Sequence, residues 1–368
     1  MHIAARNGRI DLLENLVPKL TEKNPKGENG ITPLHLAAKH GHVEVVRYFK
    51  QWLTDIHPKA DERVHQMTPL HCAAIEGHLE VVKMLVKSLR NNINPAQSNG
   101  KTVLHLAAEY GHQEIVWFYT SQSHINPGQS FKGEFEGKTP LHYAAQEGKL
   151  SVVRHLCTLL PENPNPSDFS GDTPLHLAAR CGHLKVVVFY TEEQKIVNPA
   201  KASTCFKGRT PLHDAAQNGH NNIVHYFCSI LAEKNPCDEY GYTPLHLAAE
   251  NGHFRVVKTI ANLLEGKHPL TDTKVTPANL AKNAGHFQIA NYLWHGSDGF
   301  EFHDESNLSL RKRSDEARQS LFTLKNLSTA IQRSFSLAPR KPKKATFKVY
   351  PRSHNESELE NLLFKATL

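Results

Sequence analysis

The chain lacks the long apolar segments that a membrane protein needs. Its 368 residues contain no run of 18 or more apolar residues, and no charged-then-apolar segment opens the chain. Because a helix needs about 20 apolar residues to cross a bilayer, we expect neither a membrane span nor a signal peptide. The sequence therefore indicates a cytoplasmic protein, or a nuclear one.

Cysteine is also scarce. The six cysteines are scattered between residues 72 and 237, and no two of them form a CxxC pair. Zinc ribbons, redox-active dithiols and disulfide scaffolds depend on paired or closely spaced cysteines, so the sequence favours none of them. We interpret the cysteines as small core residues in a reducing compartment.

The net charge of +7 is small for this length and is unevenly distributed. Residues 297–368 contain 13 Lys and Arg residues and 9 Asp and Glu residues, whereas residues 1–296 contain 30 and 27. The long N-terminal part is thus nearly neutral and has no basic stripe for a phosphate backbone. We do not expect a nucleic acid as partner.

Histidine, in contrast, is abundant. Most of the 25 histidines belong to a phrase that reads TPLHLAAKHGH from Thr32 and returns at Thr68, Thr102, Thr139, Thr173, Thr210 and Thr243, with a degraded copy at Thr276. The copies begin 33 to 37 residues apart, a period typical of stacked helical repeats. Repeat register therefore places these histidines, and we expect no metal site among them.

Each copy contains the signals of a short helix. Thr32 suits the N-cap and Pro33 the first helical position, where no backbone N–H is needed. Gly41 suits the left-handed position that ends the helix. A second apolar helix follows, and an X-Pro dipeptide then begins an extended loop. We assign the same structural roles to His35 and to the matching residues Thr173, Pro174, His176 and Gly182.

The phrase, its period and the helix-turn-helix-loop order resemble the ankyrin-repeat family over residues 2–296. The resemblance implies an all-α solenoid of stacked helix pairs with projecting hairpin fingers. It also implies that the TPLH histidine bonds the backbone within and between repeats, and that fingers and first helices bind partners. We expect about nine repeats in residues 1–296, followed by a mostly irregular basic tail at 297–368.

The two ends of the array differ in sequence. Met1 aligns with the leucine of TPLH, so we expect an unsealed first repeat, either because residues precede it or because it frays. The last repeat has Ala278 and Asn279 in place of leucine and histidine, as suits a polar cap.

In the tail, apolar residues seven apart predict an amphipathic helix at about 308–336. A basic cluster reads as a nuclear-import signal or a solvated charge run: Arg340, Lys341, Lys343 and Lys344.

Three alternate fingers are longer than their neighbours. From each loop proline to the next threonine the chain runs 7, 10, 7, 12, 7, 11, 7 and 7 residues. Aromatic and basic residues in long loops are natural partner contacts, but duplication of a repeat pair would produce the same rhythm. Both interpretations stay open.

No catalytic or cofactor motif appears. GEFEGKT, residues 133–139, resembles a phosphate-binding loop, but it has three residues between its glycines where that loop needs four. We therefore predict a protein that is not an enzyme, with no cofactor and no small-molecule substrate.

The sequence favours a scaffold that binds other proteins through the concave face and fingers. Two alternatives remain: an adaptor that brings partners to a ubiquitin ligase or a phosphatase, and a nuclear transcriptional cofactor. The residues predicted to contact partners are Lys101, Tyr110, Phe131, Lys132, Phe135, Lys138, Arg180, Phe206, Lys207, Arg209 and Tyr242.

Overall fold

The computed structural model describes residues 1–89, 92–130, 137–194, 198–200, 203, 208–264 and 269–295. The chain divides into two units, Met1–Leu293 and Trp294–Leu368, and nearly all described residues belong to the first. The helix predicted at 308–336 and the basic cluster at 340–344 lie outside the described residues.

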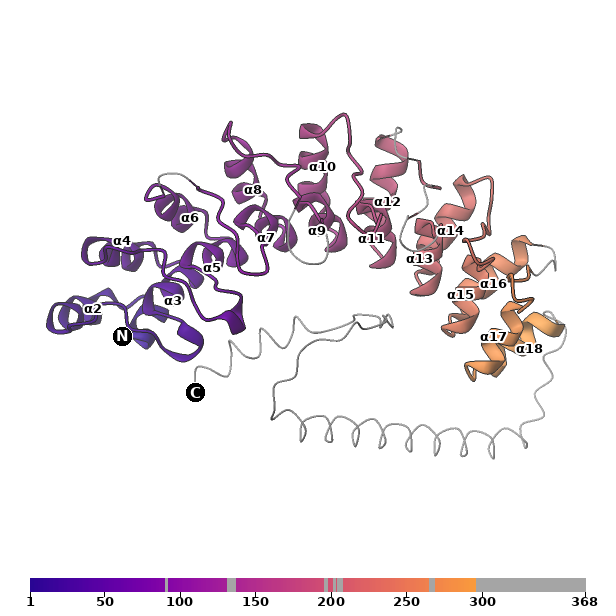
Figure 1. Cartoon of the computed structure of the whole chain (residues 1–368), viewed down its shortest axis with the longest axis horizontal. Helices are drawn as coiled ribbons and strands as arrows, with labels where there is room; N and C mark the ends of the chain where they lie inside the picture. Colours follow the sequence, from indigo (N-terminus) through magenta and orange to yellow (C-terminus); the bar gives the residue numbers. More distant parts are fainter. Residues whose placement is uncertain are drawn as a thin grey trace, which may run out of the picture. The chain divides into compact units, whose positions relative to one another are not determined.

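The described part of the first unit consists of nine helix pairs stacked in chain order (Figure 1). The first helices are α1 (His2–Arg6), α3 (Pro33–Lys39), α5 (Pro69–Glu76), α7 (Val103–Tyr110), α9 (Pro140–Gln146), α11 (Pro174–Arg180), α13 (Pro211–Gln217), α15 (Pro244–Glu250) and α17 (Pro277–Asn283). The second helices are α2 (Ile10–Leu16), α4 (Val43–Trp52), α6 (Leu79–Val86), α8 (Gln113–Thr120), α10 (Leu150–Leu159), α12 (Leu184–Val188), α14 (Asn221–Ile230), α16 (Phe254–Leu263) and α18 (Phe287–His295).

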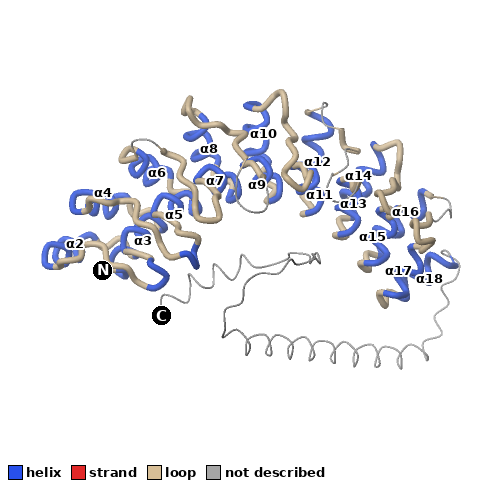
Figure 2. Tube along the Cα trace, viewed as in Figure 1, coloured by secondary structure: helices blue, strands red, loops and turns tan. Residues whose placement is uncertain are grey.

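The helices form two rows. Each first helix packs on the first helices of the neighbouring pairs, and each second helix packs on the neighbouring second helices. The first helices follow the inner side of the curved row and the second helices its outer side (Figure 1). Four short helical turns, η1 (Val17–Lys19), η2 (Glu28–Gly30), η3 (Glu62–Val64) and η4 (Phe189–Glu193), and loops make up the rest of the described chain (Figure 2). One isolated bridge, Ala96–Thr102, is the only β pairing there. The predicted all-α solenoid is confirmed.

The threonine and histidine of each phrase start the first helix together. The backbone N–H of Thr32 donates to Nδ1 of His35 at 3.1 Å, and the Thr32 hydroxyl lies 2.9 Å from the same atom. Thr173 and His176 repeat this arrangement at 3.3 and 2.9 Å. Because Pro33 has no N–H to satisfy, the first turn leaves one fewer unpaired donor. Thr32 and Thr173 are thus the N-cap residues of α3 and α11, and a proline follows each of them.

The other ring nitrogen of the histidine reaches the next repeat. Nε2 of His35 lies 3.0 Å from the carbonyl oxygen of Met67, the residue before the next repeat threonine. Equivalent contacts of 3.1 to 3.3 Å join His105 to Lys138, His142 to Asp172, His176 to Arg209, His213 to Tyr242 and His246 to Val275. His71 differs, because its Nε2 contacts the carbonyl of Pro95 instead. One buried side chain thus bonds two successive repeats.

The carbonyl oxygen that the histidine contacts also accepts a backbone hydrogen bond that closes the finger. The N–H of Ala60 donates to the Met67 carbonyl at 2.9 Å, and the N–H of Asp168 donates to that of Asp172 at 2.8 Å. The same carbonyl therefore accepts one bond from its own finger and one from the preceding repeat. The base of each such finger is held from both sides.

At Gly182, which follows α11, two separate constraints require glycine. Gly182 has φ +86°, a left-handed value that disfavours residues with a Cβ. A Cβ at Gly182 would also lie 2.7 Å from Cε1 of His220 in the next repeat. Nε2 of His220 contacts the carbonyl of Arg180 at 2.9 Å. The sequence placed the GH histidines by register but did not reveal this second bridge between repeats.

Short and long loops, which alternate along the chain, differ in the hydrogen bond that their asparagine makes. Asn24 Oδ1 accepts from the N–H of Leu34, and Asn165 Oδ1 accepts from that of Leu175, both at 3.1 Å. Asn94 and Asn235 do the same at 2.9 and 3.0 Å. In the longer loops, Asn126 and Asn198 instead accept from Gly128 and Ala200, two residues on. Loop length therefore decides whether this asparagine caps the next helix.

The long fingers are described only in part. In the first, the turn η3 (Glu62–Val64) folds back and buries Val64 at its end. Residues 131–136, 201–202 and 204–207 lie outside the described residues, and with them Phe131, Lys132, Phe135, Phe206 and Lys207. The contacts predicted for these residues stay predictions.

The interpretation of the cysteines needs a correction. Cys72, Cys157 and Cys228 are buried, but Cys181 and Cys237 are exposed. Cys181 follows Arg180 at the end of α11, where the chain turns outward, and Cys237 lies in a finger loop. Repeat position, rather than residue type, decides their burial.

We expect Gly182→Ala to destabilise the array more than Gly285→Ala. Gly285 has nearly the same φ, +84°, but a Cβ there would meet nothing within 4 Å. Its replacement should cost about 1 kcal/mol of backbone strain, whereas Gly182→Ala should cost roughly 2–4 kcal/mol because the His220 ring must also move. Urea unfolding followed by circular dichroism measures both; equal losses would refute the histidine contact.

Candidate partner-binding surface

The inner surface comprises the residue before each repeat threonine and the two residues that follow each Ala-Ala pair. In its N-terminal part, Ile31 and Met67 before the threonines are apolar and almost fully buried, and Lys39 pairs with Glu76 at 3.8 Å after the Ala-Ala pairs. From Lys101 onward, several residues before the threonines are charged as well. Four of the residues predicted to contact partners lie in this charged part: Lys101, Lys138, Arg180 and Arg209.

Lys101 is held by a buried carboxylate. Its Nζ donates to both oxygens of Glu109, at 2.8 and 2.9 Å, and Glu109 is only 5% exposed. The same Nζ lies 4.5 Å from the ring centre of Tyr143 in the next repeat, and Nζ of Lys138 lies 5.8 Å from that ring. Two cations therefore contact one buried aromatic ring, which links repeats at this point.

Arg180 joins two repeats in the same way. Its Nη1 donates to Asp172 at 2.7 Å, and its Nη2 donates to both oxygens of Asp214 at 3.1 Å. Burial alone would lower the pKa of Arg180, but the two carboxylates raise it. The guanidinium is thus firmly charged, and 28% of its side chain stays accessible.

Arg209 continues the series. Its Nη1 donates to the Gln217 side chain at 2.8 Å and its Nε to Asp238 at 3.4 Å. Asp238 in turn accepts from the backbone N–H groups of Tyr240 and Tyr242, which holds the finger turn. The charge on the inner surface is therefore connected to the conformation of the finger.

Asp168 holds the equivalent turn of another finger. Its Oδ1 accepts from the N–H groups of Ser170 and Asp172 at 2.8 and 2.9 Å. Burial, together with the nearby charge of Asp172, raises the pKa of Asp168 to about 6. The carboxylate that holds this finger turn is therefore protonated at a higher pH than an ordinary aspartate.

The two tyrosines predicted to bind partners lie at this surface. The Tyr110 ring stacks parallel to that of His112 with centres 6.5 Å apart, and the residue is 40% exposed. Tyr242 is half-buried against His246 at 5.8 Å. Exposed, anchored aromatic rings are suited to protein contacts.

The sequence did not reveal the acidic partners of these cations. Asp214 lies in the TPLHDAA copy, where most other copies have an apolar residue, and Arg180 lies in the preceding repeat. The sequence held one signal for this pair: an Asp at a position that is usually buried, with an Arg in the preceding repeat. Whether the two side chains meet depends on how the two repeats stack.

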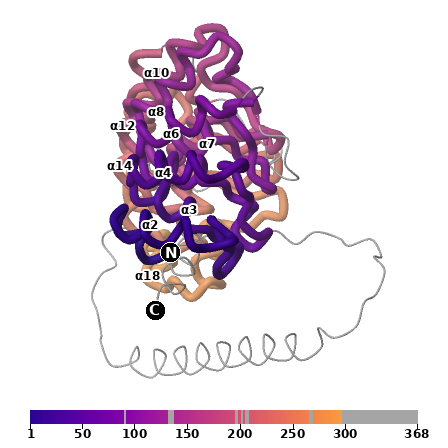
Figure 3. The backbone as a smooth tube through the Cα atoms, turned by 90° about the vertical axis from the view of Figure 1, so that its left-hand side faces the viewer, coloured from indigo at the N-terminus to yellow at the C-terminus, as the bar shows by residue number. Residues whose placement is uncertain are grey.

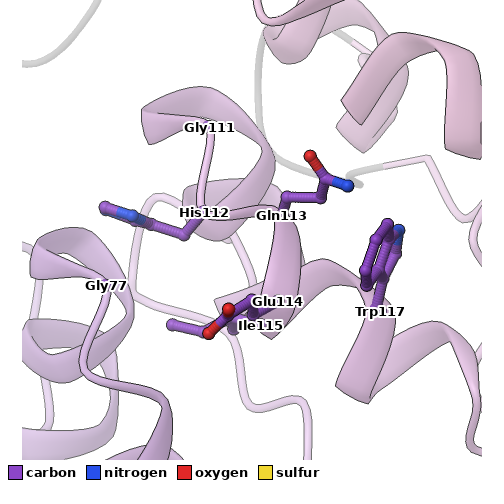
Figure 4. A pocket seen from close by; sticks show the side chains of 7 residues that line it. All are labelled: Gly77, Gly111, His112, Gln113, Glu114, Ile115 and Trp117. Atoms are coloured by element: carbon purple, nitrogen blue, oxygen red, sulfur yellow. The ribbon is translucent and has the colours of Figure 1, made fainter. Parts of the chain in front are cut away.

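A shallow pocket of about 440 Å³ lies beside the turns that join first and second helices. It is lined by the two turn glycines Gly77 and Gly111 and by residues of α8, with Gln113 and Trp117 at one side (Figure 4). Its His112 already contacts the carbonyl of Ile75 at 2.6 Å. Nowhere in the described chain do three His, Cys, Asp or Glu side chains gather in a metal-binding arrangement, and no described helix is long and apolar enough to cross a membrane.

Comparison with known families agrees with this geometry. The family model described as ankyrin repeats (3 copies) matches residues 1–96, 50–130, 89–160, 121–189 and 194–268. The chain belongs to the ankyrin-repeat family. None of the curated proteins compared with it matches the sequence. Ankyrin arrays are in general protein-interaction modules and are typically non-catalytic.

We expect Arg180→Met to destabilise the ankyrin array by about 3 kcal/mol, because it leaves Asp172 and Asp214 buried without their cation. Arg154→Met is the matched control, since Arg154 pairs with Glu193 at the exposed outer side. It should cost less than about 1 kcal/mol. Urea unfolding distinguishes the two; a similar loss for both would mean that the inner pair adds no stability.

Acid should destabilise the ankyrin array. Burial lowers the pKa of His35, His71, His105 and His213 to about 4, and that of His142 to about 3. An unfolded chain binds these protons near pH 6.5, so the stability present above that pH is lost as pH falls from 6.5 to 4.

Asp168 acts in the opposite direction, because its raised pKa adds stability as pH falls through about 6. Burial raises the pKa of Asp214 as well, but seven buried TPLH histidines have lowered pKa values, so the histidines should dominate. We expect the thermal midpoint to fall by roughly 10 °C or more between pH 7 and pH 5. A midpoint that stays constant or rises over this range would contradict the burial of neutral histidines.

Proposed function

We propose that this ankyrin array binds other proteins through its inner surface and fingers and catalyses no reaction. The observation that supports this is the row of partly accessible cations, Lys101, Arg180 and Arg209, each oriented by a buried carboxylate. Side chains held in this way lose little conformational entropy when a partner binds.

The neighbouring exposed residues would provide specificity. Five exposed residues follow the Ala-Ala pairs of five different repeats: His40, Glu76, Tyr110, Asn218 and Glu250. They differ from repeat to repeat, whereas the buried positions beneath them are nearly constant. A partner that contacts several repeats would therefore meet a sequence-specific pattern on a regular scaffold.

The adaptor and the nuclear-cofactor alternatives both depend on the tail, residues 297–368. The tail lies outside the described residues, so the contacts in the described part of the array favour neither alternative. The proposal accordingly concerns the binding surface and the class of partner, which is protein.

A matched pair of variants tests the proposal by affinity capture from cell lysate with quantitative mass spectrometry. The inner variant carries Tyr110→Ala and Glu250→Lys, and the outer variant carries Trp117→Ala and Arg255→Glu. Tyr110 and Trp117 lie in the same repeat and are 40% and 47% exposed. We expect the inner variant to lose main partners at least about tenfold and the outer variant to retain them, as expected for an interface aromatic residue.

Circular dichroism first establishes that both variants are folded. If the outer variant loses the partners and the inner one retains them, binding occurs on the other side of the array. If neither loses them, the described array is not the binding surface.

A further inference from the structure

One buried carboxylate oxygen on the inner surface has no hydrogen-bond partner. Oδ1 of Asp172 is the only buried Asp or Glu oxygen of the described chain in this condition, and Asp172 is 3% exposed. Glu109, by comparison, receives Lys101 on both of its oxygens, at 2.8 and 2.9 Å. A buried acceptor without a donor costs free energy, so Asp172 has unused capacity for a further donor.

Asp172 lies where a finger meets a first helix. It immediately precedes Thr173, the N-cap of α11, and its backbone N–H donates to Oδ1 of Asp168 in the finger turn at 2.9 Å. In Figure 3 the first helices α3 and α7 lie between the second helices and the finger loops. The Asp172 carboxylate thus belongs to the corner of the inner surface that finger and first helix form together.

Arg180 is already committed to other oxygens. Its Nη1 donates to Oδ2 of Asp172 at 2.7 Å, whereas its Nε and Nη2 donate to Asp214 at 3.1 to 3.3 Å. If the guanidinium turned toward Oδ1 of Asp172, it would give up bonds to Asp214, which is itself buried. A second donor for Asp172 therefore has to come from another group.

The charges around Asp172 favour a cation as that donor. After burial, the charge of Asp172 raises the pKa of both Asp168 and Asp214. Lys138 opposes this effect at Asp168, and Arg180 opposes it at Asp214. Three carboxylates thus face two cations, and a third cation would relieve their mutual repulsion.

We propose that Asp172 binds a cationic side chain, arginine or lysine, of a partner protein. The inference rests on the proposed binding role of the inner surface and names the chemistry that a partner presents there. Arg180 would keep its bonds to Asp214 while the partner's cation donates to Asp172. Phe169, in the same finger turn, is 63% exposed and can pack on the aliphatic stem of that side chain. Binding requires the side chains that cover Oδ1 to shift, as interface side chains commonly do.

Selection from a phage-displayed library of random peptides, with the full chain as bait, tests this proposal. We expect the enriched peptides to share a basic residue at one position. Replacing it with glutamine in the synthetic peptide should weaken binding at least about tenfold, as for a lost buried charge pair. Fluorescence polarisation measures the affinities. Enriched peptides without a shared basic residue would overturn the proposal.

The matched variants are Asp172→Asn and Glu109→Gln. Each removes the charge of a buried inner-surface carboxylate at nearly constant shape, but only Asp172 has an oxygen without a partner. In Asp172→Asn the peptide's basic residue should lose its effect, whereas in Glu109→Gln the effect of about tenfold should persist. The same effect in both variants would contradict the pairing. The peptide replacement uses the unchanged chain, so it decides the proposal even where Asp172→Asn lowers stability.

A third variant separates this proposal from the proposed function. Cys181 is exposed beside Arg180, so Cys181→Trp should block the inner surface there whatever the charge of the peptide. If Cys181→Trp abolishes binding but the peptides share no basic residue, the surface binds proteins and only the cation site is refuted. If the peptides bind Cys181→Trp unchanged, they do not bind at Asp172 and the proposal falls. Capture with the inner and outer variants then decides the proposed function independently.

Discussion

The array depends on one buried imidazole in each repeat from α3–α4 to α15–α16. Nδ1 of His35 accepts the N–H of Thr32 at the start of its own helix, and Nε2 contacts the Met67 carbonyl of the next repeat. Helices of seven or eight residues are marginal alone, so these joints, with the apolar packing between pairs, must supply the stability. A ring that bonds both ways can do so only while it is neutral, and burial keeps it neutral.

The same joint connects the fold to the binding surface. The carbonyl that receives each bridging histidine, with the exception at His71, belongs to the residue before the next threonine. The side chain of that residue is a predicted partner contact in some of these repeats, as at Arg209 and Tyr242. The histidine thus holds the backbone beneath the inner surface, while the buried carboxylates Asp214 and Asp238 hold the side chains above it. Scaffold and surface are joined at these points.

The sequence predicted the local features of each repeat, but it did not predict the contacts between neighbouring repeats. Thr32 and Pro33 predict the start of a helix, and Gly41 predicts its end, because capping preference and preferred φ are properties of a single residue. The bond from His220 to Arg180, 40 residues earlier, requires the stacking geometry. The sequence showed that the fingers alternate in length. It did not show that the loop asparagine caps the next helix only in the short loops, which required the hydrogen-bond distances. Two cysteines were misassigned because burial follows repeat position rather than residue type.

The most direct test of this account is a long-range ¹⁵N NMR experiment on the histidine rings, repeated as pH is lowered from 7.5 to 5. We expect the buried TPLH histidines to carry their single proton on Nε2, to leave Nδ1 as acceptor, and to stay neutral throughout. If the TPLH histidines instead carry the proton on Nδ1, or titrate with the exposed ones, then they do not bridge successive repeats.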